Sequence, residues 1–517
     1  MFKLVYASSV SMTFELENKD IYYSSKPYDI YVNDKLEIKE GRTNIFSLFG
    51  LLPQNKYKIT LVMGEKRYSK EFETKDEYVA IDVRSFGAKG DGISDDTKAL
   101  QSAIMCCPDN GRIIIANGTY LCSPLFLRSN ITIEIKKDGM IKGIPNKEAY
   151  PIMPGQVRLS LEDEYYQLST WEGCSSDNYA SLITGINVSN VNIVGEGIID
   201  GGALESTWWE NVKPSKYGNR PRTIFLNKCN NINLQGITVQ NSPSWTIHPY
   251  FSKNINAFDL KINNPKDSPN TDGFNPESSQ GVTILGVVFS VGDDCIAIKS
   301  GKYEMGRRYK TPSSHITIRN CLMQFGHGAV VLGSECSGGV KDLNVERCYF
   351  KGTDRGLRIK TRRGRGKDAI IDGITFKNII MDGVLTPLVI NMFYFCDEDG
   401  KTQYVWSKDL LPVDERTPYL GKFCFKDIKC SNVEYSAGYF AGLPEQKIGE
   451  IVIENVTFSY KDDAGSGYPA MMSFIEKQSK QGLYFLNVHK IKLKNVNFEG
   501  VAKDEVELNC VDEYDRN

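Results

Sequence analysis

Two aspartate-containing segments of the sequence could carry out acid–base chemistry. Asp272 lies in the segment NTDG (270–273), and Asp293 and Asp294 lie about 20 residues further on in GDDC (292–295). If the two segments occupy equivalent positions on neighbouring strands, which lie about 4.8 Å apart, their carboxylates are near neighbours. Like charges placed together raise the pKa of one carboxyl group, so that it stays protonated and can act as a general acid.

Two later segments supply basic side chains. His327 lies between glycines in GHG (326–328), and these glycines leave room for a bulky ligand against the backbone. Arg358 and Lys360 alternate in the segment RIK, so in a strand both project to the same face. There they could offset the carboxylates or bind a carboxylate of a ligand. Each segment alone is also common in turns or on solvated strands, but the order and spacing of all four favour one shared site.

Short strands that recur along the chain are the elements that must position these residues. Beyond about residue 180, β-branched strands followed by Gly or Asn turns recur every roughly 20–35 residues. Examples are NVNIVG (190–195), NINLQG (231–236) and GVTILG (281–286). One such unit cannot bury its own apolar face, so the units must stack. No long helical pattern follows, which disfavours alternating α/β folds. We therefore predict an all-β protein built on a right-handed parallel β-helix.

The predicted β-helix domain covers residues 78–517. Near its start, Asp95 or Asp96 can cap a short helix with apolar residues on one face, and this helix would cover the open end of the strand stack. The segments from about 144 to 180 and from about 395 to 420 do not fit the repeat. We expect them to project as loops on the binding side.

Residues 1–77 are predicted to form a separate small β-sandwich in front of the β-helix. Apolar and polar residues alternate there in short runs with turns between them, which is typical of antiparallel strands. Leu52 and Pro53 followed by Tyr57 resemble the corner motif of fibronectin type III modules. No catalytic group of residues is evident in this module.

Composition narrows the classes of partner and compartment. The formal net charge of −2 gives no general case for nucleic acid or membrane partners, and no window is apolar and long enough to span a bilayer. The 13 cysteines include no CxxC pair, so they favour a reducing compartment over disulfides or zinc. We expect small buried hydrophobes at Cys229, Cys295, Cys321 and Cys348. The start of the sequence lacks the apolar run of a secretory signal, so we expect a cytoplasmic protein, or a secreted one if a leader was removed.

The four segments NTD, GDD, GHG and RIK match, in order, the signature segments of glycoside hydrolase family 28, the polygalacturonases. The sequence is similar to this family from about residue 80 to 517. The segment 241–249 (NSPSWTIHP) also resembles one that the family carries upstream. The stretch 82–104 resembles the opening of pectate-lyase-like β-helix enzymes.

This resemblance implies inverting hydrolysis of α-1,4-linked galacturonan, with a galacturonan oligosaccharide or polysaccharide as the substrate. By the resemblance, Asp293 is the general acid that protonates the glycosidic oxygen, and Asp272 and Asp294 hold and deprotonate the attacking water. Inverting enzymes keep acid and base about 6.5–9.5 Å apart to leave room for that water. The resemblance implies no metal and no other cofactor, unlike pectate lyases, which share the fold but use calcium and β-elimination.

The remaining site residues are also assigned by resemblance. His327 would tune the general acid, and Arg358 and Lys360 would bind the galacturonate carboxylate at the cleavage position. Asn270 of the first signature segment is expected among the substrate-binding residues. Further arginines add positive charge beside the site, which suits a polyanionic substrate: Arg355, Arg362, Arg363 and Arg365.

The N-terminal module and the two insertions resemble bacterial exo-acting members of the family. In those members, insertions wall off one end of the cleft and the polymer enters by its non-reducing end, so we expect exo action here. The alternatives are an endo-polygalacturonase, a hydrolase of another pectic backbone, and a non-catalytic β-helix protein that binds carbohydrate. The last would have no reason to keep the three aspartates and His327 together. Product length, tolerance of methyl esters, oligomeric state and the role of the module stay open.

Overall fold

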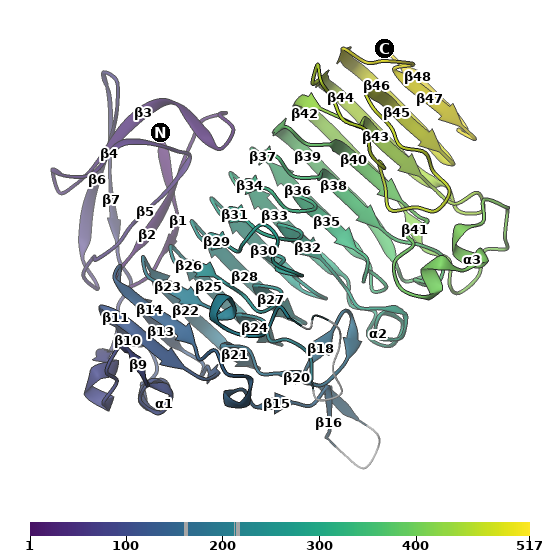
Figure 1. Cartoon of the computed structure of the whole chain (residues 1–517). Coiled ribbons are helices and arrows are strands. Elements are labelled where there is room, and N and C mark those ends of the chain that lie inside the picture. The colour runs from purple at the N-terminus through teal and green to yellow at the C-terminus, as the bar shows by residue number, and fades with distance from the viewer. Residues whose placement is uncertain (160–163, 211, 213–217) are drawn as a thin grey trace.

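The computed structural model describes residues 1–159, 164–210, 212 and 218–517. Figure 1 shows a long stack of strands with a small β module beside its N-terminal half. Successive coils pair in parallel along the whole stack. The protein is therefore a right-handed parallel β-helix preceded by a small sandwich, as the sequence predicted.

One face of the β-helix, called the first stack here, carries the candidate site. This stack is a four-stranded sheet followed by a seven-stranded sheet. Isolated parallel bridges through Phe274 and Glu277 connect the two sheets. Its strands are β12 (Leu125–Phe126), β21 (Ile183–Ile186), β24 (Ile224–Asn227), β27 (Ile247–Tyr250), β32 (Ile296–Ile298), β35 (Val330–Gly333), β38 (Arg355–Lys360), β40 (Thr386–Asn391), β43 (Ser436–Ala441), β45 (Gln481–Leu486) and β47 (Val506–Asn509).

The other faces belong to one large parallel sheet. Its longer strands are β10 (Gly111–Ile115), β13 (Ile131–Ile135), β22 (Ser189–Gly195), β25 (Asn230–Gln235), β28 (Lys253–Phe258), β30 (Gln280–Leu285), β33 (Ser313–Arg319), β36 (Val340–Glu346), β39 (Ile370–Asp382), β42 (Lys422–Val433), β44 (Ile448–Tyr460) and β46 (Val488–Glu499). Its shorter ones are β11 (Gly118–Cys122), β14 (Gly139–Gly143), β23 (Ile198–Asp200), β26 (Thr238–Gln240), β29 (Lys261–Asn263), β31 (Val288–Ser290), β34 (Leu322–Gln324) and β37 (Tyr349–Lys351).

The interior is filled by β-branched and other apolar side chains that repeat in register from coil to coil. Val191, Ile232, Ile255 and Val282 pair in sequence along four strands, and all four are fully buried. This in-register burial is what the repeated apolar positions required, because a single coil leaves its face open to water. Four cysteines are also buried in this interior, as predicted: Cys229, Cys295, Cys321 and Cys348.

A short helix covers the N-terminal end of the stack, as predicted, and of the two aspartates expected to cap it Asp95 supplies the side-chain hydrogen bond. Helix α1 (Thr97–Cys106) buries Leu100 and Ile104 against the first coils. Asp96 is at the N-cap position, yet its carboxylate accepts hydrogen bonds from Lys89 N and Gly90 N instead of from the helix. Asp95 accepts the hydrogen bond from Thr97 N.

The N-terminal module is a two-sheet antiparallel sandwich. One sheet contains β1 (Phe2–Ala7), β2 (Met12–Leu16) and β5 (Ile45–Leu48), and the other contains β4 (Lys35–Thr43), β3 (Tyr23–Val32), β6 (Lys56–Met63) and β7 (Lys66–Glu73). The predicted corner is present, because Leu52 N donates a hydrogen bond of 2.7 Å to Tyr57 Oη. Strands β8 (Val79–Asp82) and β9 (Asp91–Asp95) then join the large parallel sheet.

Within the described ranges, three insertions that line the candidate site leave the repeat. Residues 144–180 form short antiparallel pairs, although residues 160–163 lie outside the described ranges. These pairs are β15 (Ile152–Met153) with β20 (Asn178–Tyr179), β16 (Gln156–Arg158) with β17 (Tyr165–Gln167), and β18 (Thr170–Trp171) with β19 (Cys174–Ser175). Residues 392–418 contain the short helix α3 (Gln403–Trp406). A third insertion, 461–480 between β44 and β45, was not predicted. A further helix, α2 (Tyr303–Tyr309), follows β32. No helix in the described part of the chain is long and apolar enough to cross a lipid bilayer.

Candidate active site

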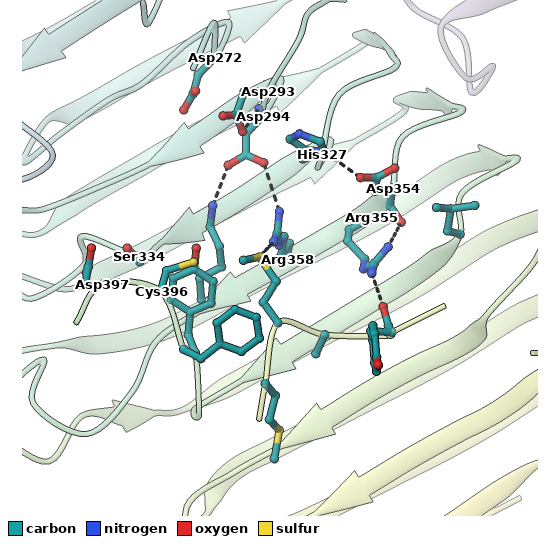
Figure 2. Close-up of a pocket in the computed structure, with 18 of the residues that line it drawn as sticks. Asp272, Asp293, Asp294, His327, Ser334, Asp354, Arg355, Arg358, Cys396 and Asp397 are labelled. Atoms are coloured by element: carbon teal, nitrogen blue, oxygen red, sulfur yellow. Dashed lines mark hydrogen bonds and ion pairs between the residues drawn. The ribbon is translucent and has the colours of Figure 1, made fainter. Parts of the chain in front are cut away.

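The three aspartates lie on neighbouring rungs of the first stack. Gly273 N, directly after Asp272, donates a hydrogen bond of 3.0 Å to Asp294 O, and His327 N donates one of 3.1 Å to Asp293 O. Consecutive rungs therefore carry the NTD, GDD and GHG segments side by side. Figure 2 shows the three aspartates together at one side of a cavity, with His327 next to them.

Asp294 is a buried carboxylate held by two cations. Lys360 Nζ lies 2.8 Å from its Oδ2, and Arg358 Nη1 lies 3.8 Å from its Oδ1. Both cations project from β38 to one face, as the alternation predicted. Burial raises the pKa of Asp294, but the Lys360 and Arg358 cations outweigh this effect, so its pKa lies below the usual value. Asp294 therefore stays ionised, and its buried Oδ1 accepts no hydrogen bond from the described residues.

Asp272 and Asp293 are shifted in the opposite direction. Burial and the nearby Asp293 charge raise the pKa of Asp272 well above its usual value. Burial and the adjacent Asp294 charge raise the pKa of Asp293. Asn275 Nδ2 donates a hydrogen bond of 2.7 Å to Asp272 Oδ2. One site thus combines an ionised carboxylate with carboxyl groups that hold protons more firmly than usual, which is the arrangement that acid–base chemistry needs.

His327 is held by a partner that sequence reasoning did not identify. Its Nδ1 lies 2.8 Å from Asp354 Oδ2, and this hydrogen bond raises the pKa of His327. Asp354 lies in the turn directly before β38. Aspartates are common in turns, so the sequence did not mark Asp354 as a site residue. The glycine before His327 also has a structural reason. Gly326 has φ +80°, and a Cβ there would lie 2.3 Å from Asp293 O. The glycine allows the rungs to approach.

All seven predicted site residues line one cavity of about 1100 Å³: Asn270, Asp272, Asp293, Asp294, His327, Arg358 and Lys360. Asn270 Oδ1 accepts a hydrogen bond of 2.5 Å from Arg220 Nη2. Within the described ranges, no group of three or more His, Cys, Asp and Glu side chains is placed to hold a metal ion.

The insertions supply the walls of the cavity. Trp171 and Glu172 come from the first insertion and residues 394–397 from the second, as expected. Residues 466–477, which we call the strap, come from the unpredicted third insertion. Tyr394 and Met472 form an antiparallel backbone bridge, so the second insertion and the strap meet. Turn-forming residues in DDAGSG (462–467) were the available sign of this interruption.

Three of the four arginines expected beside the site are buried and do not line the cavity. Arg362 and Arg363 are each 1% exposed, and Arg365 is 4% exposed. Arg362 lies 3.1 Å from Asp397, and Arg363 lies 2.5 Å from Glu445. Arg362 therefore holds the second insertion, and Arg363 holds the loop between β43 and β44. Of the four, Arg355 lines the cavity.

A buried pair of aromatic rings and a buried ion pair complete the wall near Asp272, and sequence reasoning missed both. Trp171 and Trp245 stack with ring centroids 6.3 Å apart. Lys299 Nζ lies 4.5 Å from the centre of the Trp245 ring and 2.8 Å from Glu335 Oε2. The Lys299 and Glu335 positions carried no distinguishing pattern, because both follow ordinary apolar strands.

Comparison with known proteins agrees with this geometry. The family described as glycosyl hydrolases family 28 matches residues 164–410, and the family described as rhamnogalacturonase A/epimerase, pectate lyase-like matches residues 80–148. A probable polygalacturonase from Vitis vinifera is 33% identical over 340 residues, covering 62% of this chain and 67% of that protein. An exopolygalacturonase from Zea mays is 29% identical over 392 residues, covering 72% and 87%. Relatives named endo-polygalacturonase match at similar identity.

The fold comparison spans both parts of the molecule. The structure of a family 28 exopolygalacturonase from Yersinia enterocolitica matches with a TM-score of 0.72 and 20% identity, covering 100% of this chain and 98% of that one. The sandwich is therefore included in the match, and the site lies on the same kind of β-helix. The family match, the sequence relatives and the four signature segments on neighbouring rungs show the same family. This chain belongs to glycoside hydrolase family 28.

Proposed function

We propose that the chain is a polygalacturonase that hydrolyses α-1,4-galacturonosyl linkages with inversion, acting as an exo-enzyme from the non-reducing end. The observation that carries the proposal is the opposite shift of neighbouring carboxyl pKa values in one cavity. Asp294 is kept ionised by Lys360 and Arg358, whereas the pKa of Asp293 is raised by burial and by Asp294. Cations around these groups suit a uronate substrate.

In this proposal Asp293 donates its proton to the glycosidic oxygen as the bond to the anomeric carbon breaks. Asp294 accepts the proton of the attacking water through Oδ1, which is free of hydrogen bonds from the described residues. Asp272, held by Asn275, orients that water. His327 limits how far the pKa of Asp293 rises, because its positive charge favours the Asp293 carboxylate. Arg358 and Lys360 bind the carboxylate of the sugar at the cleavage position.

Exo action is supported by the walls of the cavity. The second insertion and the strap meet at one wall of the cavity, and in this proposal that wall blocks the path of an extended polymer through the site. That contact includes the Tyr394–Met472 bridge and a hydrogen bond of 3.4 Å that Phe395 N donates to Met471 O. From the end of β40, Asn391 Nδ2 donates a further hydrogen bond of 2.9 Å to Met471 O. A cleft obstructed in this way favours substrates that enter by one end of the chain.

The test is a size-resolved time course on a hexagalacturonate carrying a fluorescent label at its reducing end. Exo action from the non-reducing end predicts unlabelled monomer or dimer at once, together with labelled products that shorten stepwise. A mixture of mid-sized labelled products at the first time points would show endo action. Release of the label with the first small product would show attack from the reducing end.

A further inference from the structure

Arg355 lines the cavity without a carboxylate partner. Its Nε donates to Pro469 O at 2.9 Å, its Nη1 to Asp354 O at 2.7 Å and its Nη2 to Tyr468 O at 2.6 Å. Each Nη atom of an arginine carries two N–H groups, so both keep a second donor. No carboxylate of the described residues lies within 4.0 Å of this guanidinium. Figure 2 shows Arg355 and Asp397 on opposite sides of the view, and the hydrogen bonds to Pro469 and Tyr468 place the Arg355 guanidinium against the strap.

The other cations that line the catalytic side of the cavity each lie within ion-pair distance of a carboxylate of the protein. Lys360 and Arg358 share Asp294, and Lys299 is paired with Glu335 at 2.8 Å. On the strap side, Lys477 also lines the cavity, and within the described ranges it has no carboxylate at ion-pair distance. Arg355 and Lys477 therefore give this side of the cavity positive charge, and the nearby Asp354 carboxylate, which is already paired with His327, acts on Arg355 only from beyond ion-pair distance.

Arg355 is half-buried, and a partly buried cation without an ion-pair partner is costly, so folding alone gives no reason to place it beside a second arginine. Burial and the neighbouring Arg358 charge lower the pKa of Arg355 to about 10. An incoming carboxylate would offset both effects. A guanidinium fork held by three backbone carbonyls is also fixed in orientation, which reduces the entropy lost on binding.

We infer that Arg355 binds the carboxylate of a second galacturonate unit, adjacent to the unit held by Arg358 and Lys360. This inference rests on the proposed function and adds a substrate requirement to it. Two neighbouring units must carry free carboxylates, because a methyl ester removes the charge that Arg355 would pair with. The Tyr435 ring, whose centre lies 5.8 Å from the Arg355 guanidinium, forms part of the same wall.

The experiment measures kcat/KM for oligogalacturonates that carry a single methyl ester on a defined unit. Wild-type protein should cleave the oligogalacturonate whose methyl ester lies on the unit facing Arg355 about tenfold less efficiently than the unesterified one. This is the loss expected when one charge-assisted pair is removed. Arg355→Gln should lose about tenfold on the free acid and very little on this ester, so that the preference disappears. Arg355→Lys should keep part of the preference. Arg307→Gln, on exposed helix α2, is the matched control and should leave both values unchanged.

The outcomes separate the inference from the proposed function. A wild-type enzyme that tolerates an ester at every unit beyond the one held by Arg358 and Lys360 would overturn the inference even if both variants failed to fold. Equal losses on free acid and ester in Arg355→Gln would show that Arg355 acts only by holding the strap. Failure of the wild type to cleave any oligogalacturonate would instead refute the proposed function.

Discussion

At the residue scale, the site depends on how three neighbouring carboxyl groups are kept in different protonation states. Asp294 is ionised because two cations from β38 contact it, and Asp293 resists ionisation because it is buried and Asp294 lies beside it. The same pair of cations thus has two roles in our account. They keep the base charged in the free protein, and they bind the uronate carboxylate in the complex.

Replacing the proposed acid should remove turnover and spare the fold. Asp293→Asn keeps the size of the side chain but cannot donate a proton to the leaving oxygen, so kcat should fall by about 10²–10⁴-fold. KM and the melting temperature should change little. Steady-state kinetics and thermal melts measure both, with the exposed Asp504→Asn as the control. Activity within a few-fold of wild type would remove Asp293 from the role of acid.

Replacing the histidine should move the pH dependence of kcat/KM. The His327 cation lowers the pKa of Asp293, so His327→Gln should raise that pKa further. A general acid is active only while protonated, so the alkaline limb of the profile should shift to higher pH, while overall activity falls. Profiles of both proteins on the same oligogalacturonate test this. A limb that stays in place, or moves to lower pH, would contradict the electrostatic role.

The residue types and their order could be predicted, but their pairings could not. The spacing of NTD, GDD, GHG and RIK placed the groups on successive rungs, and the structure has them there. Nothing in the sequence indicated that Asp354 holds His327, or that Lys299 pairs with Glu335 behind the site. Such pairings depend on side-chain positions across rungs, which a strand repeat leaves undetermined.

At the element scale, a tight turn brings the GHG rung against the GDD rung. Gly326→Ala would add two costs, because the residue has φ +80° and its Cβ would lie 2.3 Å from Asp293 O. We expect a loss of about 1–3 kcal/mol in the free energy of unfolding and a marked loss of activity. Gly352→Ala is the matched control, since φ is +64° there and the nearest atom lies 4.0 Å away. Equal effects of the two substitutions in thermal melts and assays would mean that the close approach is unimportant.

The β-helix could be predicted because every coil repeats the same apolar positions. Of its three insertions described above, only the first two could be predicted. The first two insertions break the repeat over long, unusual stretches. The strap is shorter and lies between two strands of ordinary pattern, β44 and β45, so it was missed. The pairing of Arg362 and Arg363 was missed for a related reason. Their partners Asp397 and Glu445 lie in loops distant in the sequence.

At the scale of the whole molecule, the N-terminal module is fastened to the outside of the β-helix. Tyr6 stacks on Phe258 with ring centroids 5.2 Å apart, and Ile45 packs in the same cluster. Glu15, 1% exposed, lies 2.7 Å from Arg319 and 3.4 Å from Arg347. These contacts involve residues of several coils. The module therefore stabilises the packing of those coils, in addition to any other role, and we call this contact region the brace.

Removing the charge of Glu15 should weaken this brace in a pH-dependent way. Burial raises the pKa of Glu15, but Arg319 and Lys3 outweigh it, so its folded pKa lies below the unfolded value. Its contribution to stability is therefore present above the unfolded pKa and is lost as pH falls through the folded pKa. Glu15→Gln should cost about 1–3 kcal/mol at neutral pH and progressively less in acid. Melts across pH, with exposed Glu17→Gln as the control, test this, and a constant difference at all pH values would contradict it.

The central claim is that the cavity performs inverting hydrolysis of a galacturonan. The most direct test is time-resolved NMR, which follows the configuration of the new reducing end as the enzyme cleaves trigalacturonate in the presence of a chelator. The account predicts that the first product carries a new reducing end in the β configuration, which then equilibrates, and that all products are saturated. It also predicts that Asp293→Asn yields neither anomer at a measurable rate. A new reducing end that appears first in the α configuration would show retention. Products with an unsaturated ring would show elimination, and either result would contradict the mechanism proposed for these aspartates.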